Sequence, residues 1–302
     1  MSFDKNTYKK IKTLVKNELE KVDENLCEIN STSKEFNDYI KEYISAPSKR
    51  IRTVLTFLYL KANNKEITEE QINLQTVIEI IHNATLIHDD IIDEAEIRRN
   101  LPSVNKKFDN SLAVIAGDYL LSIALKKLLK INNTEILNIF AKTIENMCVG
   151  EISQYFSKYK MPTIYEYIEK SRGKTSSLFE ASLISASILA GLNTKTAEKL
   201  ANNFGIAFQI RDDILNFKNN DNKPVNNDYE NGIYTAPAIY AECDLNNITL
   251  GIEKASQLLD NYLCNTRDAI STLEESNYKN ALTTILDLLK LWTEIIKKFT
   301  QK

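Results

Sequence analysis

The chain has 302 residues, of which 38 are basic and 41 acidic, giving a formal net charge of −3. This balance gives no general attraction for nucleic acid or another polyanion, so any anion-binding patch must be local. Two histidines are too few for chemistry that needs several, and four widely spaced cysteines form no CxxC pair. Seven glycines and five prolines are very few, which helices tolerate and turn-rich β folds do not. We therefore predict an all-α protein.

The N-terminal third carries helix signals in close succession. We expect helices at about 5–28, 33–45 and 49–63. A capping box at Thr68–Gln71 then predicts the start of a long helix that runs through Ile92.

The rest of the chain continues the helical pattern. Asn110 is expected to cap one helix, Thr163–Glu166 is a second capping box, and Gly191 is a typical C′ residue. Asn193 or Thr194 is expected to start the next helix, and two or three more follow residue 245. The irregular stretch at 218–232 is interpreted as a loop that closes over a site, and no strand alternation is visible.

Two acidic segments on this helical sequence are the most informative feature. They read Asp89-Asp90-Ile-Ile-Asp93 and Asp212-Asp213-Ile-Leu-Asn216. Residues four apart share a helix face, and carboxylates crowded on an apolar helix repel unless a cation compensates them. Two such faces turned toward each other would form an oxygen-rich site suited to Mg²⁺.

Basic residues stand near both acidic segments. Arg98 and Arg99 follow the first segment and point in different directions, so the pair can serve two phosphate groups. Lys49-Arg-Ile-Arg52 opens a helix, where the N-terminus also attracts anions. Gly173-Lys174-Thr175 interrupts a helical run, and Lys223 lies in the long polar loop.

With these motifs in order, the chain resembles the polyprenyl synthetase family, the trans-isoprenyl diphosphate synthases. The matching stretches are KRIR at 49–52, IHNATLIHDDIIDEAEIRR at 81–99, AGDYL at 116–120, GKTSSLF at 173–179, FQIRDD at 208–213 and NKPVNNDYENGIYTAPAIYA at 222–241. The resemblance implies one domain over residues 1–302 with the isoprenoid synthase fold, an antiparallel helix bundle around a deep central cavity.

The same resemblance implies a transferase that condenses an allylic diphosphate with isopentenyl diphosphate. It implies three Mg²⁺ ions per active site when diphosphate is bound. The implied metal site comprises Asp89, Asp90, Asp93, Asp212 and Asp213. The implied allylic diphosphate site comprises Arg98, Lys174, Thr175, Gln209 and Lys223. The implied isopentenyl diphosphate site comprises Lys49, Arg52, His82 and Arg99. Of all these, Asp89, Asp93, Lys174 and Asp212 are expected to be catalytic.

Product length is predicted from the residues that precede the first acidic segment. Ala84 and Thr85 are small where short-chain members carry an aromatic residue, and Ile81 comes next on the same face. We expect a product longer than fifteen carbons, as in heptaprenyl and octaprenyl synthases. A product of fifteen to twenty carbons is the alternative, and close helix packing is a purely structural reason for the small residues.

Three positions depart from the family pattern. Asn216 replaces a third aspartate, Ile233 stands where many members carry a second loop lysine, and Ser48 replaces a glycine. Together they leave room for a slow enzyme or for a catalytic subunit that needs a partner.

Other functions are less consistent with the residues. A class I terpene cyclase has a differently spaced second metal motif and no second diphosphate site, and an HD-type phosphohydrolase built on His88-Asp89 needs more histidines. A regulatory subunit would have lost the acidic motifs.

We expect a homodimer, with a heterodimer containing a small subunit as the alternative. No signal peptide or apolar run long enough to cross a membrane is visible, so we expect a cytoplasmic protein, peripheral to the membrane when it releases product.

Overall fold

The computed structural model describes residues 5–217 and 227–300, and the side chains of 6–217 and 228–290. The first five helices are α1 (Lys5–Thr13), α2 (Lys16–Cys27), α3 (Lys34–Ser45), α4 (Ile51–Ala62) and α5 (Glu69–Ile92), and α5 carries the first acidic segment. A short hairpin, β1 (Ile97–Arg98) and β2 (Leu101–Pro102), leads to α6 (Val104–Lys107), α7 (Asn110–Ile131) and α8 (Thr134–Ser157). The remaining elements are α9 (Ile164–Ser171), a π-helical turn at Arg172–Ser176, α10 (Ser177–Leu189), α11 (Thr194–Asn216), α12 (Asn227–Glu230), α13 (Ala236–Tyr240), a 3-10 turn at Leu245–Asn247, α14 (Ile248–Ser271) and α15 (Asn277–Thr300). The all-α prediction is confirmed.

Most of the predicted helix starts are found in the structure. The Thr163 and Glu166 side chains form a complete reciprocal capping box, and Asn193 caps α11. Gly191 follows the end of α10 with a φ of +64°, a backbone conformation that glycine adopts without strain. These local signals worked because a cap depends only on residues a few positions apart.

Some local expectations were wrong. The predicted helix at 5–28 breaks at Leu14 and Val15, whose amides bond three residues back instead of four. Asp109, not Asn110, caps α7 by accepting the Leu112 amide at 2.7 Å. The structure adds one short hairpin, in which the two-residue strands β1 and β2 pair antiparallel and are too short to show an alternating pattern.

The capping box predicted at Thr68–Gln71 is half formed. The Thr68 hydroxyl accepts the Gln71 amide at 3.3 Å. The Gln71 side chain does not reach back, because it donates to the Ala186 carbonyl of α10 at 2.9 Å. A tertiary contact therefore replaces half of the local motif and ties α5 to α10.

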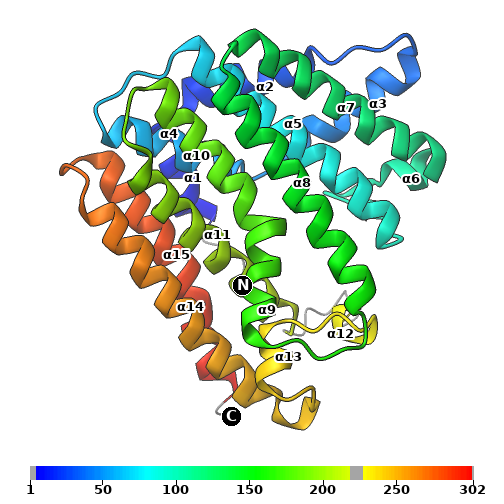
Figure 1. Cartoon of the computed structure of the whole chain (residues 1–302), viewed down its shortest axis with the longest axis vertical. Coiled ribbons are helices and arrows are strands. Elements are labelled where there is room, and N and C mark those ends of the chain that lie inside the picture. The colour runs from blue at the N-terminus through cyan, green and yellow to red at the C-terminus, as the bar shows by residue number, and fades with distance from the viewer. Residues whose placement is uncertain (1–4, 218–226, 301–302) are drawn as a thin grey trace.

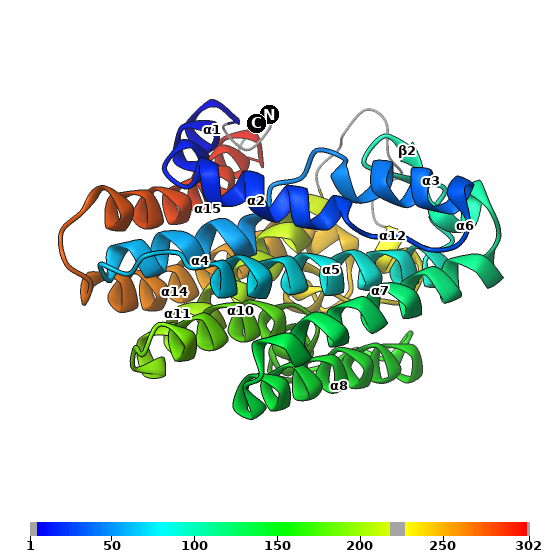
Figure 2. The ribbon, with the colours of Figure 1, turned by 90° about the horizontal axis from the view of Figure 1, so that it is seen from above.

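Helices α5 and α11 are the two central elements. α5 packs against α7, α2 and α10, while α11 packs against α14, α10 and the π-helical turn. Figure 1 shows these helices within the bundle, and Figure 2 shows α8 at one outer edge with α7 beside it. Of the helices that the structure describes, none has the length and apolar character needed to cross a membrane.

The acidic segments lie at the C-terminal ends of these two helices. Asp89 and Asp90 belong to the last turn of α5, Asp93 caps it, and Asp212 and Asp213 lie in the last two turns of α11. A helix C-terminus already carries partial negative charge, so carboxylates there add to an unfavourable field. This arrangement favours a bound cation at each of these helix ends.

Candidate active site

The outer carboxylates of the first motif are accessible at the end of α5, where Asp89 is half-buried and Asp93 is exposed. Burial raises the pKa of Asp89 to about 6, although the nearby Lys174 ammonium opposes this rise. Burial also raises the pKa of Asp93, with Lys174 again opposing it and Asp228 adding to it. Raised carboxylate pKa values mean that the positive charge present does not fully compensate the acids. A bound divalent cation would supply that charge.

The middle carboxylate of this motif, Asp90, faces the protein interior. It is fully buried, accepts the Tyr43 hydroxyl at 3.1 Å, and accepts Nε of Arg98 at 2.9 Å with a second contact from Nη2. Arg98 was predicted to bind the allylic diphosphate, and Asp90 to support the metal. In the structure Asp90 and Arg98 bind each other. This ion pair fixes the hairpin, which carries Arg98, to helix α5.

The hairpin presents Arg99 at its tip. Arg99 and Asn100 have φ values of 52° and 66°, and such two-residue turns favour asparagine or glycine at both positions. An arginine in this conformation is strained, and strain that persists is common where a side chain must be aimed. Nη1 of Arg99 donates to the Asn83 side chain of α5 at 3.1 Å.

Arg99 joins Arg52 and His82 in a cluster of basic side chains. The Arg52 guanidinium lies 4.7 Å from the centroid of the Phe179 ring, and burial lowers its pKa to about 10. Within the described residues, the buried Nε of Arg52 has no hydrogen-bond partner. Burial, and then the charges of Arg52 and Arg99, hold the pKa of His82 well below its usual value. Two arginines placed close together beside a neutral histidine would suit an anion.

The other arginine of the KRIR segment has a structural role. Arg50 is buried, contacts Glu79 of α5 at 2.9 Å and Asp23 of α2 at 3.1 Å, and donates to the Ile44 carbonyl. It thereby joins α2, α4 and α5. The binding roles expected for Lys49 and Arg52 stay predictions.

The second acidic motif repeats the division between an outer and an inner carboxylate. Asp212 is half-buried and contacts Arg211 at 2.6 Å; burial raises its pKa, while Arg211 and then Lys49 oppose the rise. Asp213 is buried and accepts the Tyr167 hydroxyl at 2.6 Å and the Gln209 amide at 2.8 Å. Burial raises the pKa of Asp213 to about 7. In both motifs, therefore, a tyrosine of another helix holds the middle carboxylate.

Two predicted diphosphate ligands belong to the same network. The Thr175 hydroxyl donates to Oε1 of Gln209 at 2.5 Å, and Gln209 in turn donates to Asp213. Thr175 lies in the π-helical turn, so the predicted interruption at Gly173–Thr175 is present. The added residue in this turn lets the backbone pass close to α8, where Gly173 faces the Asn146 carbonyl.

Two acidic residues of the site were missed in the sequence. Glu151 of α8 pairs with Lys174, and Asp89 and Glu151 raise the pKa of Lys174 against the larger, lowering effect of burial. Asp228 of α12 accepts the Asn216 amide at 3.1 Å, which places a carboxylate beside the missing third aspartate. The only local sequence signal for Glu151 was a second polar residue, Gln154, three positions later on the same helix. No local signal marked Asp228 as a site residue.

The remaining predicted residues are placed as follows. Lys223 lies outside the described residues. Ile81 and Ala84 are fully buried in α5, and the Thr85 hydroxyl donates to the His82 carbonyl at 2.9 Å. His88 turns toward α7, with Nε2 3.3 Å from the Val114 carbonyl and 3.7 Å from Asp118, away from the acidic cleft.

The donor set suits Mg²⁺, because it consists of carboxylates with raised pKa values on two helix ends. Among the described side chains, no three His, Cys, Asp or Glu residues converge into a ready-made metal cage. An ion held here would need further oxygen ligands, and a substrate diphosphate supplies them.

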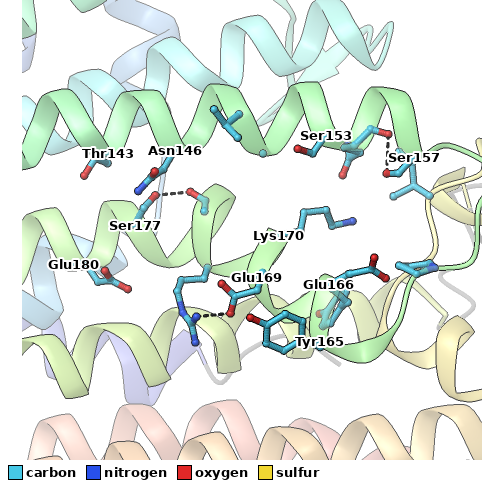
Figure 3. A pocket seen from close by; sticks show the side chains of 18 of the residues that line it. Thr143, Asn146, Ser153, Ser157, Tyr165, Glu166, Glu169, Lys170, Ser177 and Glu180 are labelled. Atoms are coloured by element: carbon cyan, nitrogen blue, oxygen red, sulfur yellow. Dashed lines mark hydrogen bonds and ion pairs between the residues drawn. The ribbon is translucent and has the colours of Figure 1, made fainter.

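One pocket of about 860 Å³ lies between α8, α9 and α10 (Figure 3). Its lining includes Lys170 and Ile233 but not Ile81, Ala84 or Thr85.

Comparison with known proteins identifies the family of this chain. Residues 33–282 match the polyprenyl synthetase family. A prenyl transferase of Cyanidium caldarium is 36% identical over 249 residues, which are 78% of this chain and 75% of the relative. Solanesyl diphosphate synthase 2 of Arabidopsis thaliana is 34% identical over 76% of this chain and 58% of its own length.

Solved structures share the fold. A decaprenyl diphosphate synthase of Rhodobacter capsulatus superposes with a TM-score of 0.85 at 22% identity, over 94% of this chain and 98% of the other. A heptaprenyl diphosphate synthase of Staphylococcus aureus gives 0.85 at 24% identity, over 91% and 98%. This chain therefore belongs to the polyprenyl synthetase family and is a transferase with the isoprenoid synthase fold.

Proposed function

We propose that this enzyme condenses an allylic diphosphate with isopentenyl diphosphate and extends the chain head to tail. The observation that carries the proposal is the presence of two separate cationic groups beside the acidic helix ends. Lys174 neighbours Asp89 and Asp93, whereas Arg52, His82 and Arg99 form their own cluster. Two diphosphate substrates require two such sites, and a terpene cyclase requires one.

Mg²⁺ held by Asp89, Asp93 and Asp212 would supply positive charge to a departing diphosphate. Lys174 would bind the same group, with Thr175 and Gln209 positioned by their contact with each other. Lys223, which lies outside the described residues, is proposed to bind the same diphosphate.

The Arg52–His82–Arg99 cluster would hold isopentenyl diphosphate, with Lys49 at its edge. The low pKa of His82 keeps its ring neutral near pH 7, so it would donate one hydrogen bond to a phosphate oxygen without acting as an acid. The released diphosphate can accept the proton lost at the end of the reaction, so no histidine base is needed. This agrees with a chain of two histidines in which His88 faces α7.

We propose a product longer than fifteen carbons. Small side chains at Ala84 and Thr85 support this, and so do relatives that are named solanesyl, heptaprenyl and decaprenyl diphosphate synthases. Geranylgeranyl synthases share the fold as well, for example that of Pyrococcus horikoshii at a TM-score of 0.82. Product length therefore depends on this chain's own cavity. The cytoplasm is the proposed location.

An elongation assay tests the proposed reaction. Purified protein is incubated with Mg²⁺, labelled isopentenyl diphosphate and, in separate reactions, allylic primers of ten, fifteen and twenty carbons, and products are sized by chromatography. We expect products longer than fifteen carbons with at least one primer, and none after chelation of the metal.

Two outcomes would change the proposal. Absence of elongation with every primer contradicts a synthase that works alone. Elongation that appears only after a second protein is added identifies this chain as the catalytic subunit of a heteromeric enzyme.

A further inference from the structure

The pocket between α8, α9 and α10 is lined by a half-buried lysine, Lys170, that the proposed reaction has not yet used. Lys170, near the end of α9, extends into the space between Ser153 of α8 and Glu166 of α9 (Figure 3). Within the described residues, its ammonium makes no hydrogen bond or ion pair and lies 6.0 Å from the Tyr167 ring centroid. A half-buried ammonium that pairs with no carboxylate is available to an anion, and a hydrogen bond between two charged groups is stronger than one between neutral groups.

The contacts of Tyr167 place Lys170 near the second acidic motif. The Lys170 ammonium lies 6.0 Å from the Tyr167 ring centroid, and the Tyr167 hydroxyl donates to Asp213 at 2.6 Å. Consistent with this position, burial lowers the pKa of Lys170 most and Lys174 lowers it further, whereas Asp213 and Asp228 raise it. Lys174 itself is paired with Glu151, so Lys170 is the less engaged of the two amines.

Two neighbours of Lys170 leave its charge available to a ligand. Ile233 lines the pocket together with Lys170 and brings no charge from the loop side. Asp213 cannot serve as a full partner for Lys170, because its two oxygens already accept Tyr167 and Gln209.

We propose that Lys170 is a further substrate-binding residue that contacts the diphosphate of the allylic substrate from the α9 side. This inference rests on the proposed function. Lys170 and Lys174 are four residues apart across the π-helical turn, so both amines would approach one diphosphate from the same wall.

The test compares Lys170→Gln and Lys170→Arg with Lys142→Gln. Lys142 lies on α8 at the far end of the same pocket and serves as the matched control. Binding of inorganic pyrophosphate in the presence of Mg²⁺ is measured by calorimetry, and KM is measured for each substrate. We expect about tenfold weaker pyrophosphate binding and a raised allylic KM for Lys170→Gln, which corresponds to one lost charged contact.

The remaining variants separate binding from structure. Lys170→Arg should retain most of the pyrophosphate affinity, and Lys142→Gln all of it, while the KM for isopentenyl diphosphate stays unchanged throughout. Unchanged pyrophosphate affinity in a folded Lys170→Gln protein would overturn the proposal. An equal rise in both KM values, or a loss of thermal stability without a binding defect, would show that Lys170 only compensates Asp213.

The wild-type protein separates this inference from the proposed function. Wild type that binds pyrophosphate and elongates a primer, beside a Lys170→Gln variant that binds equally well, contradicts the role of Lys170 alone. Wild type that neither binds pyrophosphate nor elongates any primer contradicts the function itself, and the role of Lys170 with it.

Discussion

At the scale of single residues, the two acidic motifs contain carboxylates of two kinds. The outer ones, Asp89 and Asp212, are only half-buried, and burial raises their pKa values although nearby cations oppose the rise. The inner ones, Asp90 and Asp213, are buried and hydrogen-bonded to Tyr43 and Tyr167 respectively. Substitutions at inner and outer positions should therefore have opposite consequences.

Asp89→Asn should abolish most Mg²⁺-dependent turnover without destabilising the metal-free protein. Burial disfavours the charge of Asp89, so the neutral amide should leave the melting temperature unchanged or slightly higher. We expect turnover to fall at least about 100-fold, and the rise in melting temperature on adding Mg²⁺ and pyrophosphate to shrink. Near-normal turnover would contradict the metal assignment.

Asp90→Asn should instead lower stability. The change leaves the Arg98 guanidinium without its carboxylate and removes a buried charge-assisted pair, at a cost of about 1–3 kcal/mol. We expect a melting temperature several degrees lower, with or without Mg²⁺. A stable variant that has lost only metal-dependent turnover would show that Asp90 binds the ion directly.

At the scale of elements, α5 combines two tasks in one helix. Its C-terminal turn presents the acids, and its preceding turns carry the small residues Ala84 and Thr85. If the allylic chain grows along this helix, each residue toward the N-terminus lies about 1.5 Å further from the acids. The position of the first bulky side chain would then set the length of the product.

Ala84→Phe should shorten the product. A bulky ring one turn before Asp89 would occupy the space into which the chain grows, and products would stop at or below the twenty-carbon length. Product size is measured by mass spectrometry, with Glu70→Phe on the exposed start of α5 as the control. Because Ala84 is fully buried, Ala84→Leu is a milder second variant. Unchanged products from folded variants would refute this growth path.

At the scale of the whole molecule, α7 and α8 leave an apolar face exposed. Large hydrophobic side chains on this face are exposed by 45–71%: Val114, Ile115, Leu125, Leu129, Val149, Ile152, Tyr155 and Phe156. Figure 2 places α8 at the outer edge of the bundle, where a second copy would have access. A two-fold symmetric dimer buries the same face on both subunits, and this supports the proposed homodimer.

Ile152→Lys combined with Tyr155→Lys should convert the dimer to a monomer. Charges in the middle of an apolar interface are costly to desolvate. Light scattering after size exclusion should give a mass near the chain's 34.5 kDa, against twice that for wild type. Leu250→Lys, an exposed leucine of α14, is the control. A wild-type monomer, or a double variant that remains dimeric, contradicts this interface.

The sequence by itself determined the helical class, the two acidic motifs and the basic residues that accompany them. These features depend on composition and on spacings within one or two helical turns, such as Asp89 to Asp93 or Thr163 to Glu166. They were predictable because helix periodicity and capping are local.

The tertiary structure alone decided which of these side chains act together. Tyr43 and Asp90 are 47 residues apart, Tyr167 and Asp213 are 46 apart, and Asn216 meets Asp228 across the loop. No spacing rule links such pairs, because their contact depends on how whole helices pack. For the same reason, Glu151 and Lys170 became visible as neighbours of the site only after α8 and α9 were placed against α5 and α11.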